Sequence, residues 1–236
     1  MKKLAIVPAY NEEKNIEGVI RGIQKEAPDH DILVINDGSK DRTSEIVRKF
    51  ESVKIVDLPM NLGIGGAVQT GFIYCWEKGY DICIQVDGDG QHKPSEIKKI
   101  EEPIINGEAD MVIGSRFLGS STYKTTFFRR MGIKIFYLAN RLFLREKIKD
   151  STSGFRAYNR KAVEILRRYY PDDYPEPEAI FILKKKGLRI KEVGVEMEER
   201  KGGRSSITFF RAIYYMVKVS IGIAIHILRK EEFYGG

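Results

Sequence analysis

Two carboxylates separated by one residue, Asp87 and Asp89, are the best candidates for chemistry in this chain. They follow the apolar run 81–86, and each is followed by a glycine that lets the backbone turn sharply. A buried strand would therefore deliver both carboxylates to its exposed end. Oxygen ligands of this kind suit Mg²⁺ or Mn²⁺ held jointly by protein and substrate phosphates. An ordinary surface turn explains Asp-Gly pairs as well, so the neighbouring segments must decide.

The first hundred or so residues alternate between short apolar runs and helical patterns. Such alternation predicts an α/β fold with right-handed βαβ units, a mostly parallel sheet and helices on both faces. Ligands then bind outside the carboxyl ends of the strands. The predicted strands are 3–8, 31–36, 53–58, 81–86 and 110–114, and the predicted helices are 12–25, 43–50, 65–78 and 94–106.

Polar or glycine-rich loops follow the first four predicted strands, at 8–13, 36–41, 61–66 and 87–91. Four such loops at one edge favour a single nucleotide-sized site. Taken singly, each has an ordinary explanation, because Asn11 and Asp41 are good helix starters and glycines suit turns. No dinucleotide fingerprint follows the first strand and the sequence contains no Gly-Lys-Ser/Thr phosphate loop, which argues against dehydrogenases and ATPases.

The composition fits one generous domain with an appendage, since 42% of the 236 residues are hydrophobic. Cys75 and Cys83 have no paired metal or redox spacing, and we predict two buried thiols of a reducing cytoplasm. The amino terminus has two lysines and then a strand pattern without the apolar core of a signal peptide. We therefore expect a cytoplasmic protein.

Most of the net charge of +7 lies in one segment, 121–150, which has eight cations and two acids. A basic patch suits nucleic acid, anionic lipid or phosphorylated substrates, and charge alone does not choose among them. The eight cations are Lys124, Arg129, Arg130, Lys134, Arg141, Arg145, Lys147 and Lys149.

Seven motifs, in this order over about residues 4–206, resemble family 2 glycosyltransferases of the GT-A fold. They are most similar to the polyprenyl-phosphate sugar transferases that include dolichol-phosphate mannose synthase. The resemblance implies a GT-A (Rossmann-like) nucleotide-sugar-binding domain over 1–206 and a C-terminal amphipathic helix and tail over 207–236. The motifs are VPAYNE at 7–12, VINDGSKD at 34–41, NLG at 61–63, DGDGQH at 87–92, GSRF at 114–117, DSTSGFR at 150–156 and RKGGRS at 200–205.

The resemblance also implies roles on the donor side of the site. Pro8, Tyr10 and Glu12 would border the nucleotide, and Asp37 would hydrogen-bond the base. Mg²⁺ or Mn²⁺ on the donor diphosphate would be held by Asp89 together with Asp87 and Gln91.

On the acceptor side, the resemblance implies that Ser115, Arg116 and Arg130 bind the acceptor phosphate. Arg200, together with Arg204, would close over the phosphates. These residue types suit the chemistry, because breaking the bond between sugar and diphosphate builds negative charge on the leaving group. A divalent metal and the planar fork of arginine both stabilise such charge.

The stretch 174–178 departs from the wider family. Many family 2 enzymes that transfer sugar to hydroxyls have a Glu-Asp pair there, whose Asp acts as general base, and this chain reads YPEPE. A phosphate monoester needs no such base, because its second pKa is about 6 and it is already ionised near neutral pH. Alternatively, Glu176 or Glu178 supplies a base from a shifted position or caps the following helix.

Two basic amphipathic segments could meet a membrane. In 123–145, Arg130, Lys134, Arg141 and Arg145 fall within about 60° on a helical wheel. In 207–229 the cations share one narrow stripe, and the longest run without charged residues has ten residues, 219–228, against roughly twenty needed to span a bilayer. We expect both helices to lie on a membrane surface, and the alternative is packing on the protein's own core.

The resemblance, together with these observations, implies an inverting glycosyltransferase that moves a hexose from a UDP-sugar or GDP-mannose to a polyprenyl phosphate. It would act as a peripheral protein on the cytoplasmic face of the cell membrane, without a nucleic-acid partner. Relatives in this family often carry transmembrane helices after the catalytic domain, whereas this sequence ends with EEFYGG at 231–236. We therefore expect a separate integral membrane protein as a partner. The alternatives are transfer to a saccharide hydroxyl in capsule or cell-wall synthesis, a sugar nucleotidyltransferase, and a non-catalytic basic binding protein.

Overall fold

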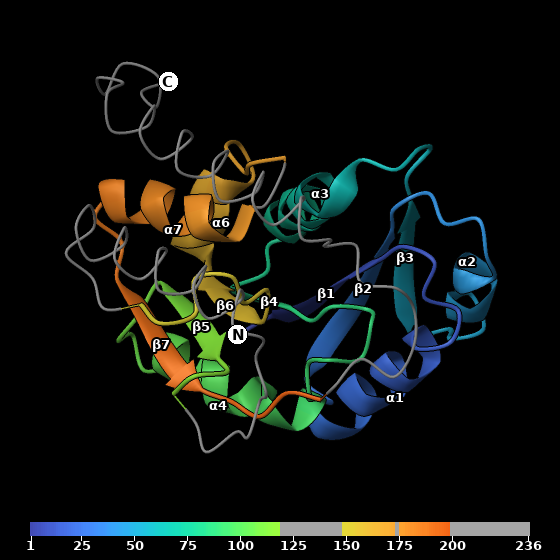
Figure 1. Ribbon diagram of the computed structural model, residues 1–236, viewed down its shortest axis with the longest axis horizontal. Helices are drawn as coiled ribbons and strands as arrows, with labels where there is room; N and C mark the ends of the chain where they lie inside the picture. The colour runs from blue at the N-terminus through green and yellow to red at the C-terminus, as the bar shows by residue number, and fades with distance from the viewer. Residues whose placement is uncertain (119–147, 173–174, 199–236) are drawn as a thin grey trace, which may run out of the picture.

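A seven-stranded sheet in the order β3-β2-β1-β4-β6-β5-β7 forms the centre of the protein in the computed structural model, which describes residues 1–118, 148–172 and 175–198 (Figure 1). All strands are parallel except β6, which is antiparallel to both β4 and β5. The mostly parallel sheet predicted from the sequence is therefore confirmed. The strands are β1 (Lys3–Ala9), β2 (His30–Asn36), β3 (Val53–Asp57), β4 (Ile82–Gln85), β5 (Met111–Ser115), β6 (Arg156–Asn159) and β7 (Ile190–Gly194).

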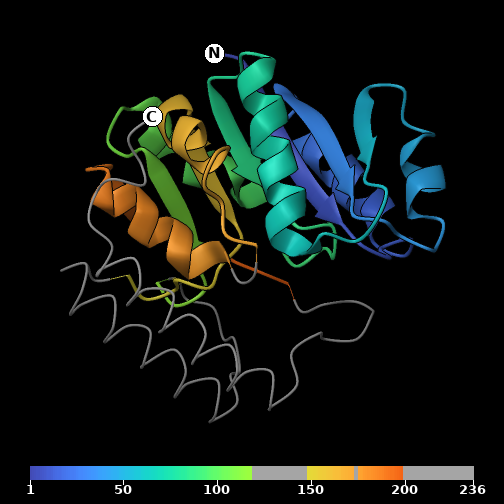
Figure 2. The same ribbon diagram turned by 90° about the horizontal axis from the view of Figure 1, so that it is seen from above.

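Helices cover both faces of the sheet, and the central strands β1 and β4 are mostly apolar and buried on both faces. α3, α6 and α7 enclose one hydrophobic core, and α1, α2 and α4 enclose the other. Seen from above, α3, α6 and α7 lie over the same face (Figure 2). The helices are α1 (Ile16–Glu26), α2 (Thr43–Val47), α3 (Gly63–Glu77), α4 (Ile97–Ile105), α6 (Arg160–Leu166) and α7 (Pro175–Lys185), and a 3₁₀ turn, Pro94–Glu96, precedes α4.

The predicted start of the first helix, at residue 12, is wrong. α1 begins at Ile16, because the backbone amides of Glu12 and Glu13 donate to the side chains of Thr43, the first residue of α2, and Asp41, in the loop before it. The second helix ends at Val47, three residues before the predicted end. Both cysteines are free and buried, as predicted.

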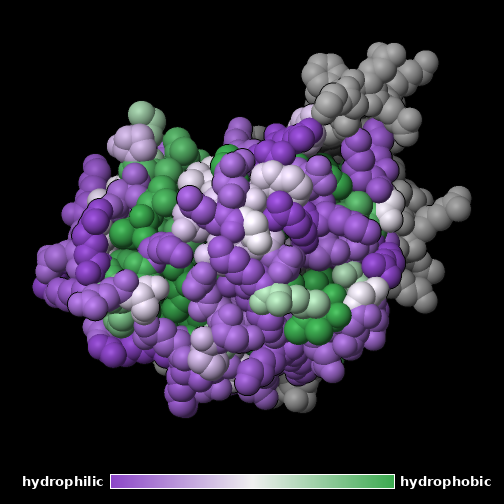
Figure 3. All heavy atoms as spheres, turned by 180° about the vertical axis from the view of Figure 1, so that it is seen from behind, coloured by the Kyte–Doolittle hydropathy of each residue, from purple (hydrophilic) through white to green (hydrophobic). Residues whose placement is uncertain are grey.

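Hydrophilic side chains cover most of the face seen from behind (Figure 3). Within the described part of the chain, we find no helix that is both long and apolar enough to cross a membrane.

Candidate active site

The loops that carry the sequence motifs meet at the edge of the sheet where the parallel strands end. Three backbone hydrogen bonds join them: the Asp37 amide donates to the Ala9 carbonyl at 2.9 Å and the Gly88 amide to the Pro8 carbonyl at 3.1 Å, and the Gly114 amide donates to the Phe155 carbonyl at 2.8 Å. Because β6 is antiparallel, the loop before it, 150–155, lies at the same edge. The predicted clustering of loops is confirmed.

Asp37 directly follows β2 at this edge and is buried, with 4% of its surface exposed. Its carboxylate accepts the backbone amides of Leu62 at 2.7 Å and Gly63 at 3.0 Å, which begin α3. Burial raises the pKa of Asp37 and outweighs these two hydrogen bonds, which lower it. Asp37 thus supports the first turn of α3 from a different loop. Its hydrogen bond to a nucleobase stays a prediction.

The loops after β1 and β2 are fastened to each other. Asn11 has a left-handed backbone, with φ of 56°, and its side-chain oxygen accepts the Lys40 amide at 2.8 Å. Asn11 therefore does not start α1. Asp41 does meet part of the capping expectation, because it accepts the amide of Thr43, the first residue of α2, at 3.0 Å.

The three residues predicted to border the nucleotide all lie on or just after β1. Pro8 is buried within the strand, Tyr10 is 45% exposed and Glu12 is 7% exposed. Glu12 also accepts the side-chain amide of Asn15 at 2.7 Å. Tyr10 is therefore the one of the three with a large accessible surface.

Asp87 and Asp89 stand just beyond the end of β4, as predicted. The Asp87 side chain is 31% exposed and accepts the side-chain amide of buried Gln85 at 3.0 Å. Asp89 accepts the backbone amide of Gln91 at 3.0 Å, across a turn that needs Gly90 at a φ of 77°. The two carboxylates therefore lie on one tight turn at the open edge.

These residues fit a hard divalent cation by their chemistry. Asp87 and Asp89 provide carboxylate oxygens and Gln91 an amide oxygen, the ligands that Mg²⁺ and Mn²⁺ prefer. Among the residues that the structure describes, no group of three or more His, Cys, Asp or Glu is placed to hold a metal alone. Phosphate oxygens and water would complete the coordination sphere of such an ion.

His92 holds Asp87 in place and was not predicted. Its Nδ1 accepts the Asp87 backbone amide at 3.0 Å, so this nitrogen carries no proton, and Nε2 lies 3.6 Å from Asp87 Oδ2. The ring is 5% exposed and stacks on Phe155, with centroids 4.8 Å apart. His92 lies within the motif at 87–92, which is the signal that could have identified it.

Gly154 also fixes the position of Asp87 and was not predicted. A Cβ atom at Gly154 would come within 2.9 Å of Gln85 Nε2 and 3.1 Å of Asp87 Oδ2. The loop before β6 therefore packs directly against the Asp87 carboxylate, and only glycine permits this approach.

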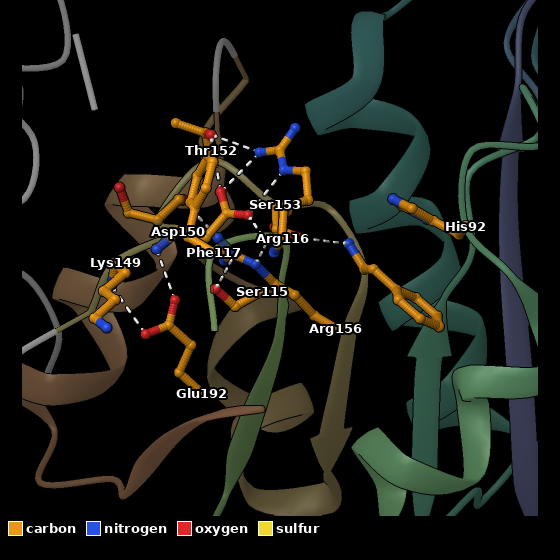
Figure 4. A network of polar contacts seen from close by, with 12 residues as sticks. His92, Ser115, Arg116, Phe117, Lys149, Asp150, Thr152, Ser153, Arg156 and Glu192 are labelled. Carbon is orange, nitrogen blue, oxygen red and sulfur yellow. Dashed lines mark hydrogen bonds and ion pairs between the residues drawn. The ribbon is translucent and has the colours of Figure 1, made fainter. Parts of the chain in front are cut away.

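Arg116 lies on the other side of β6 and is paired with Asp150 (Figure 4). Its Nε and Nη2 donate to the two carboxylate oxygens at 2.8 and 2.7 Å, and Nη2 also donates to Thr152 Oγ1 at 3.0 Å. The Asp150 side chain is fully buried and that of Arg116 is 12% exposed. The guanidinium is thus fixed in direction, and its contact with an acceptor phosphate stays a prediction.

The Arg116–Asp150 pair is itself supported from β7. Glu192 accepts the backbone amides of Asp150 at 2.7 Å and Lys149 at 2.9 Å (Figure 4). Ser115, predicted on the acceptor side, is fully buried, and its hydroxyl accepts the Phe117 amide at 3.3 Å. Three strands therefore fix this half of the site.

The family model described as Glycosyl transferase family 2 matches residues 4–166. The chain belongs to glycosyltransferase family 2. A UDP-N-acetylglucosamine–dolichyl-phosphate N-acetylglucosaminyltransferase of Methanococcus voltae is 31% identical over 244 residues, which cover 92% of this chain and 95% of the relative. An undecaprenyl-phosphate mannosyltransferase of Micrococcus luteus is 31% identical over 219 residues, which cover 88% of each chain.

The structure is also similar to solved structures. Glucosyl-3-phosphoglycerate synthase of Mycobacterium tuberculosis, in complex with Mn²⁺, UDP and phosphoglyceric acid, superposes with a TM-score of 0.73 at 18% identity. The match covers 95% of this chain and 78% of that one. At this identity the likeness shows the fold, and it confirms the predicted GT-A architecture of this family 2 glycosyltransferase.

Glu176, at the start of α7, is one of the two carboxylates, with Glu178, that the sequence offered as an alternative base. Burial raises the pKa of Glu176, and the negative charge of Asp87 raises it as well. The positive charges of Arg156 and Arg116 lower this pKa, but the net shift is upward. Glu176 is therefore close enough to both halves of the site to respond to their charges.

Several predicted residues lie outside the part of the chain that the structure describes. They are Arg130, Arg200 and Arg204, the basic helix at 123–145 and the C-terminal helix and tail at 207–236. Their roles, and the domain division at residue 206, stay predictions.

Proposed function

We propose that this family 2 glycosyltransferase moves one hexose from a nucleotide sugar, a UDP-sugar or GDP-mannose, to a polyprenyl phosphate with inversion at the anomeric carbon. One observation carries the proposal: Asp87 and Arg116 flank β6 at the same edge of the sheet, so a donor diphosphate and an anionic acceptor would meet there. The names of the relatives from Methanococcus voltae and Micrococcus luteus support a polyprenyl-type phosphate as acceptor.

In the proposed reaction, an oxygen of the acceptor phosphate attacks the anomeric carbon in line with the departing diphosphate. A new carbon–oxygen bond forms as the bond to the nucleotide breaks, and the electron pair remains on the diphosphate. Arg116 directs the acceptor phosphate, because Asp150 and Thr152 fix the orientation of its guanidinium. With a second pKa of about 6, the acceptor is already ionised and no protein base is required.

Metal dependence is part of the proposal. Asp87, Asp89 and Gln91 would hold Mg²⁺ or Mn²⁺. When bound, such an ion neutralises the charge that develops on the leaving diphosphate. The complexes of the mycobacterial synthase with UDP and Mn²⁺ or Mg²⁺ support this assignment.

A polyprenyl acceptor lies in a bilayer, so we place the reaction at a membrane surface. The enzyme would be peripheral on the cytoplasmic face, with the basic segments 123–145 and 207–229 as its contacts and a separate integral membrane protein as a partner.

Transfer to a saccharide hydroxyl is the second candidate function, and Glu176 is the observation that favours it. A partly buried carboxyl group with a raised pKa is what a general base for a hydroxyl acceptor would need. Glu176→Gln separates the two. If Glu176 is the general base for a hydroxyl acceptor, the variant should lose about 10²–10⁴-fold in kcat. If the acceptor is a phosphate, kcat of the variant should fall much less, because no base is required.

The decisive experiment incubates the purified protein with Mg²⁺ or Mn²⁺, a short-chain polyprenyl phosphate and a panel of UDP- and GDP-sugars. Mass spectrometry then detects any glycolipid. We expect one lipid-phosphate-sugar product, formed from one donor and lost when EDTA is added. Binding of a nucleotide sugar without lipid product, together with transfer to a soluble glycan, would contradict the proposal.

A further inference from the structure

Arg156, the first residue of β6, is a fully buried charge that the proposed mechanism does not use. Its guanidinium donates to three backbone carbonyls, through Nε to Ser153 at 2.7 Å, Nη1 to Glu176 at 2.8 Å and Nη2 to Ser151 at 2.8 Å. Burying a guanidinium is costly unless its N–H groups find acceptors in good geometry. Here the planar fork reaches acceptors in two separate segments of the chain.

The three carbonyls belong to the segments that support the site. Ser151 and Ser153 lie in the loop 150–155, which contains the Asp150 partner of Arg116 and the Gly154 contact of Asp87. Glu176 lies in the first turn of α7. One guanidinium therefore fastens this loop to α7, at a point between Asp87 and Arg116.

The electrostatic interactions of Glu176 agree with the position of Arg156 between Asp87 and Arg116. Both Arg156 and Arg116 lower the pKa of Glu176, and Asp87 raises it. The charge of the Glu176 side chain therefore interacts with Arg156, with Asp87 on one side of β6 and with Arg116 on the other.

We propose that Arg156 is a positioning residue that sets the place of Asp87 relative to Arg116. It does so by holding the loop 150–155 against α7, and it touches neither substrate. The inference rests on the proposed function, because it assigns Asp87 to the donor diphosphate and Arg116 to the acceptor phosphate. In-line transfer depends on this alignment, since a misplacement of about 1 Å can cost about 10²-fold in rate.

The test compares Arg156→Lys and Arg156→Met with a matched control, Arg160→Lys, at the first residue of α6, just past the far end of β6. Arg160 stacks on Trp76 at 4.1 Å and donates to the Tyr80 carbonyl at 3.2 Å, away from the site. A lysine at 156 keeps the charge, but its single ammonium cannot reproduce the three bonds of the fork. We measure kcat, both KM values, binding of the donor nucleotide with Mn²⁺, and urea unfolding.

We expect folded Arg156→Lys to lose about 30–100-fold in kcat while nucleotide binding changes less than about threefold. Arg156→Met should lose at least as much, and Arg160→Lys should stay within about twofold of the parent protein. A general loosening of the fold would weaken nucleotide binding and kcat together, which would contradict the inference.

A folded Arg156→Lys with kcat within twofold of the parent would also overturn the inference. Failure of both position-156 variants to fold would overturn it as well and would assign Arg156 to folding. The absence of lipid product from the parent protein would instead count against the proposed function.

Discussion

At the edge of the sheet where the strands begin, Asp29 and Glu101 pair with a lysine and their pKa values are lowered. At the edge where the parallel strands end, the pKa values of Asp37 and Glu176 are raised. At the first edge, Lys3 Nζ lies 2.7 Å from Asp29 and 2.8 Å from Glu101. The Lys3 hydrogen bond lowers the pKa of Asp29 to about 2. Burial acts to raise the pKa of Glu101, but hydrogen bonds from His30 and Lys3 outweigh it and lower the pKa.

At the site edge, burial raises the pKa of both Asp37 and Glu176, and their hydrogen bonds and charged neighbours do not offset it. Carboxylates that the protein itself leaves under-stabilised are suited to binding a ligand or a cation. The carboxylates paired with Lys3 thus stabilise the fold, whereas Asp37 and Glu176 cost stability when they ionise, unlike Asp150 at the same edge, which is paired with Arg116. Variants at the two edges should therefore differ in what they lose.

Asp89→Ala should give the largest effect on activity. Removing a proposed metal ligand is expected to lower transfer by about 10³-fold or more and to abolish metal-dependent donor binding. The free energy of unfolding should change by less than about 1 kcal/mol. Asp81→Ala, at the opposite end of β4, is the control, because its exposed carboxylate only accepts the Lys2 amide. Retained transfer in Asp89→Ala would refute the assigned role.

Gly154→Ala should come second, because its added Cβ would press on Gln85 and the Asp87 carboxylate. We expect kcat to fall by about 10–100-fold and the protein to lose about 1–3 kcal/mol of stability. Gly18→Ala in α1 is the matched control, since nothing lies within 4 Å of its added Cβ. It should raise stability by about 0.5–1 kcal/mol. Steady-state kinetics and urea titration measure both variants, and equal behaviour of the two would contradict the prediction.

Lys3→Met, at the edge where the strands begin, should lower stability and leave activity nearly unchanged. It leaves the nearly buried Glu101 carboxylate without its lysine partner, and we expect a loss of about 2–3 kcal/mol in urea unfolding. Transfer per folded molecule should remain within about twofold of the parent protein. A fall in kcat without loss of stability would break the comparison between the two edges.

The smallest expected effect is on acid stability. The folded pKa of Asp29, about 2, lies below its ordinary value, so its stabilisation is present above about pH 4 and is lost as pH falls toward 2. Solvent screening reduces the contribution of this half-exposed group to about 1 kcal/mol. Urea titrations at pH 5 and pH 3 should show Lys3→Met losing less stability between them than the parent protein. An identical loss in both proteins would show that the pair does not titrate as described.

The five strands predicted from the sequence match the structure to within one residue at each boundary, because each is an apolar run followed by a polar loop. β6 was missed because its four residues, RAYN, have polar ends and bury an arginine. β7 was missed because its IKEVG run has too few apolar residues. α7 begins with two prolines among acidic residues, a pattern typical of a loop, yet tertiary burial makes it helical.

The motifs located Asp87, Asp89 and Arg116 at one edge, but the partners of these residues could not be read from the sequence. The Arg116–Asp150 pair and the contact between Gly154 and Asp87 both depend on the antiparallel direction of β6. Sequence spacing contains no information on that direction. The support by His92 likewise requires the ring to fold back over the turn that precedes it.

The hydrogen bonds from Arg116 to Asp150 also have a consequence for how acceptor specificity can change among related enzymes. They join two points 34 positions apart, where the chain leaves the sheet after β5 and returns before β6. Because this pair holds the two ends of the intervening stretch, we expect that the stretch can be exchanged while the residues at its ends keep their places. We therefore expect that replacing the segment 119–147 alone changes which acceptor is recognised, while the residues proposed to bind the nucleotide sugar stay the same. A chimera with a relative's stretch at 119–147 should keep the donor preference of this chain and take the acceptor preference of the relative.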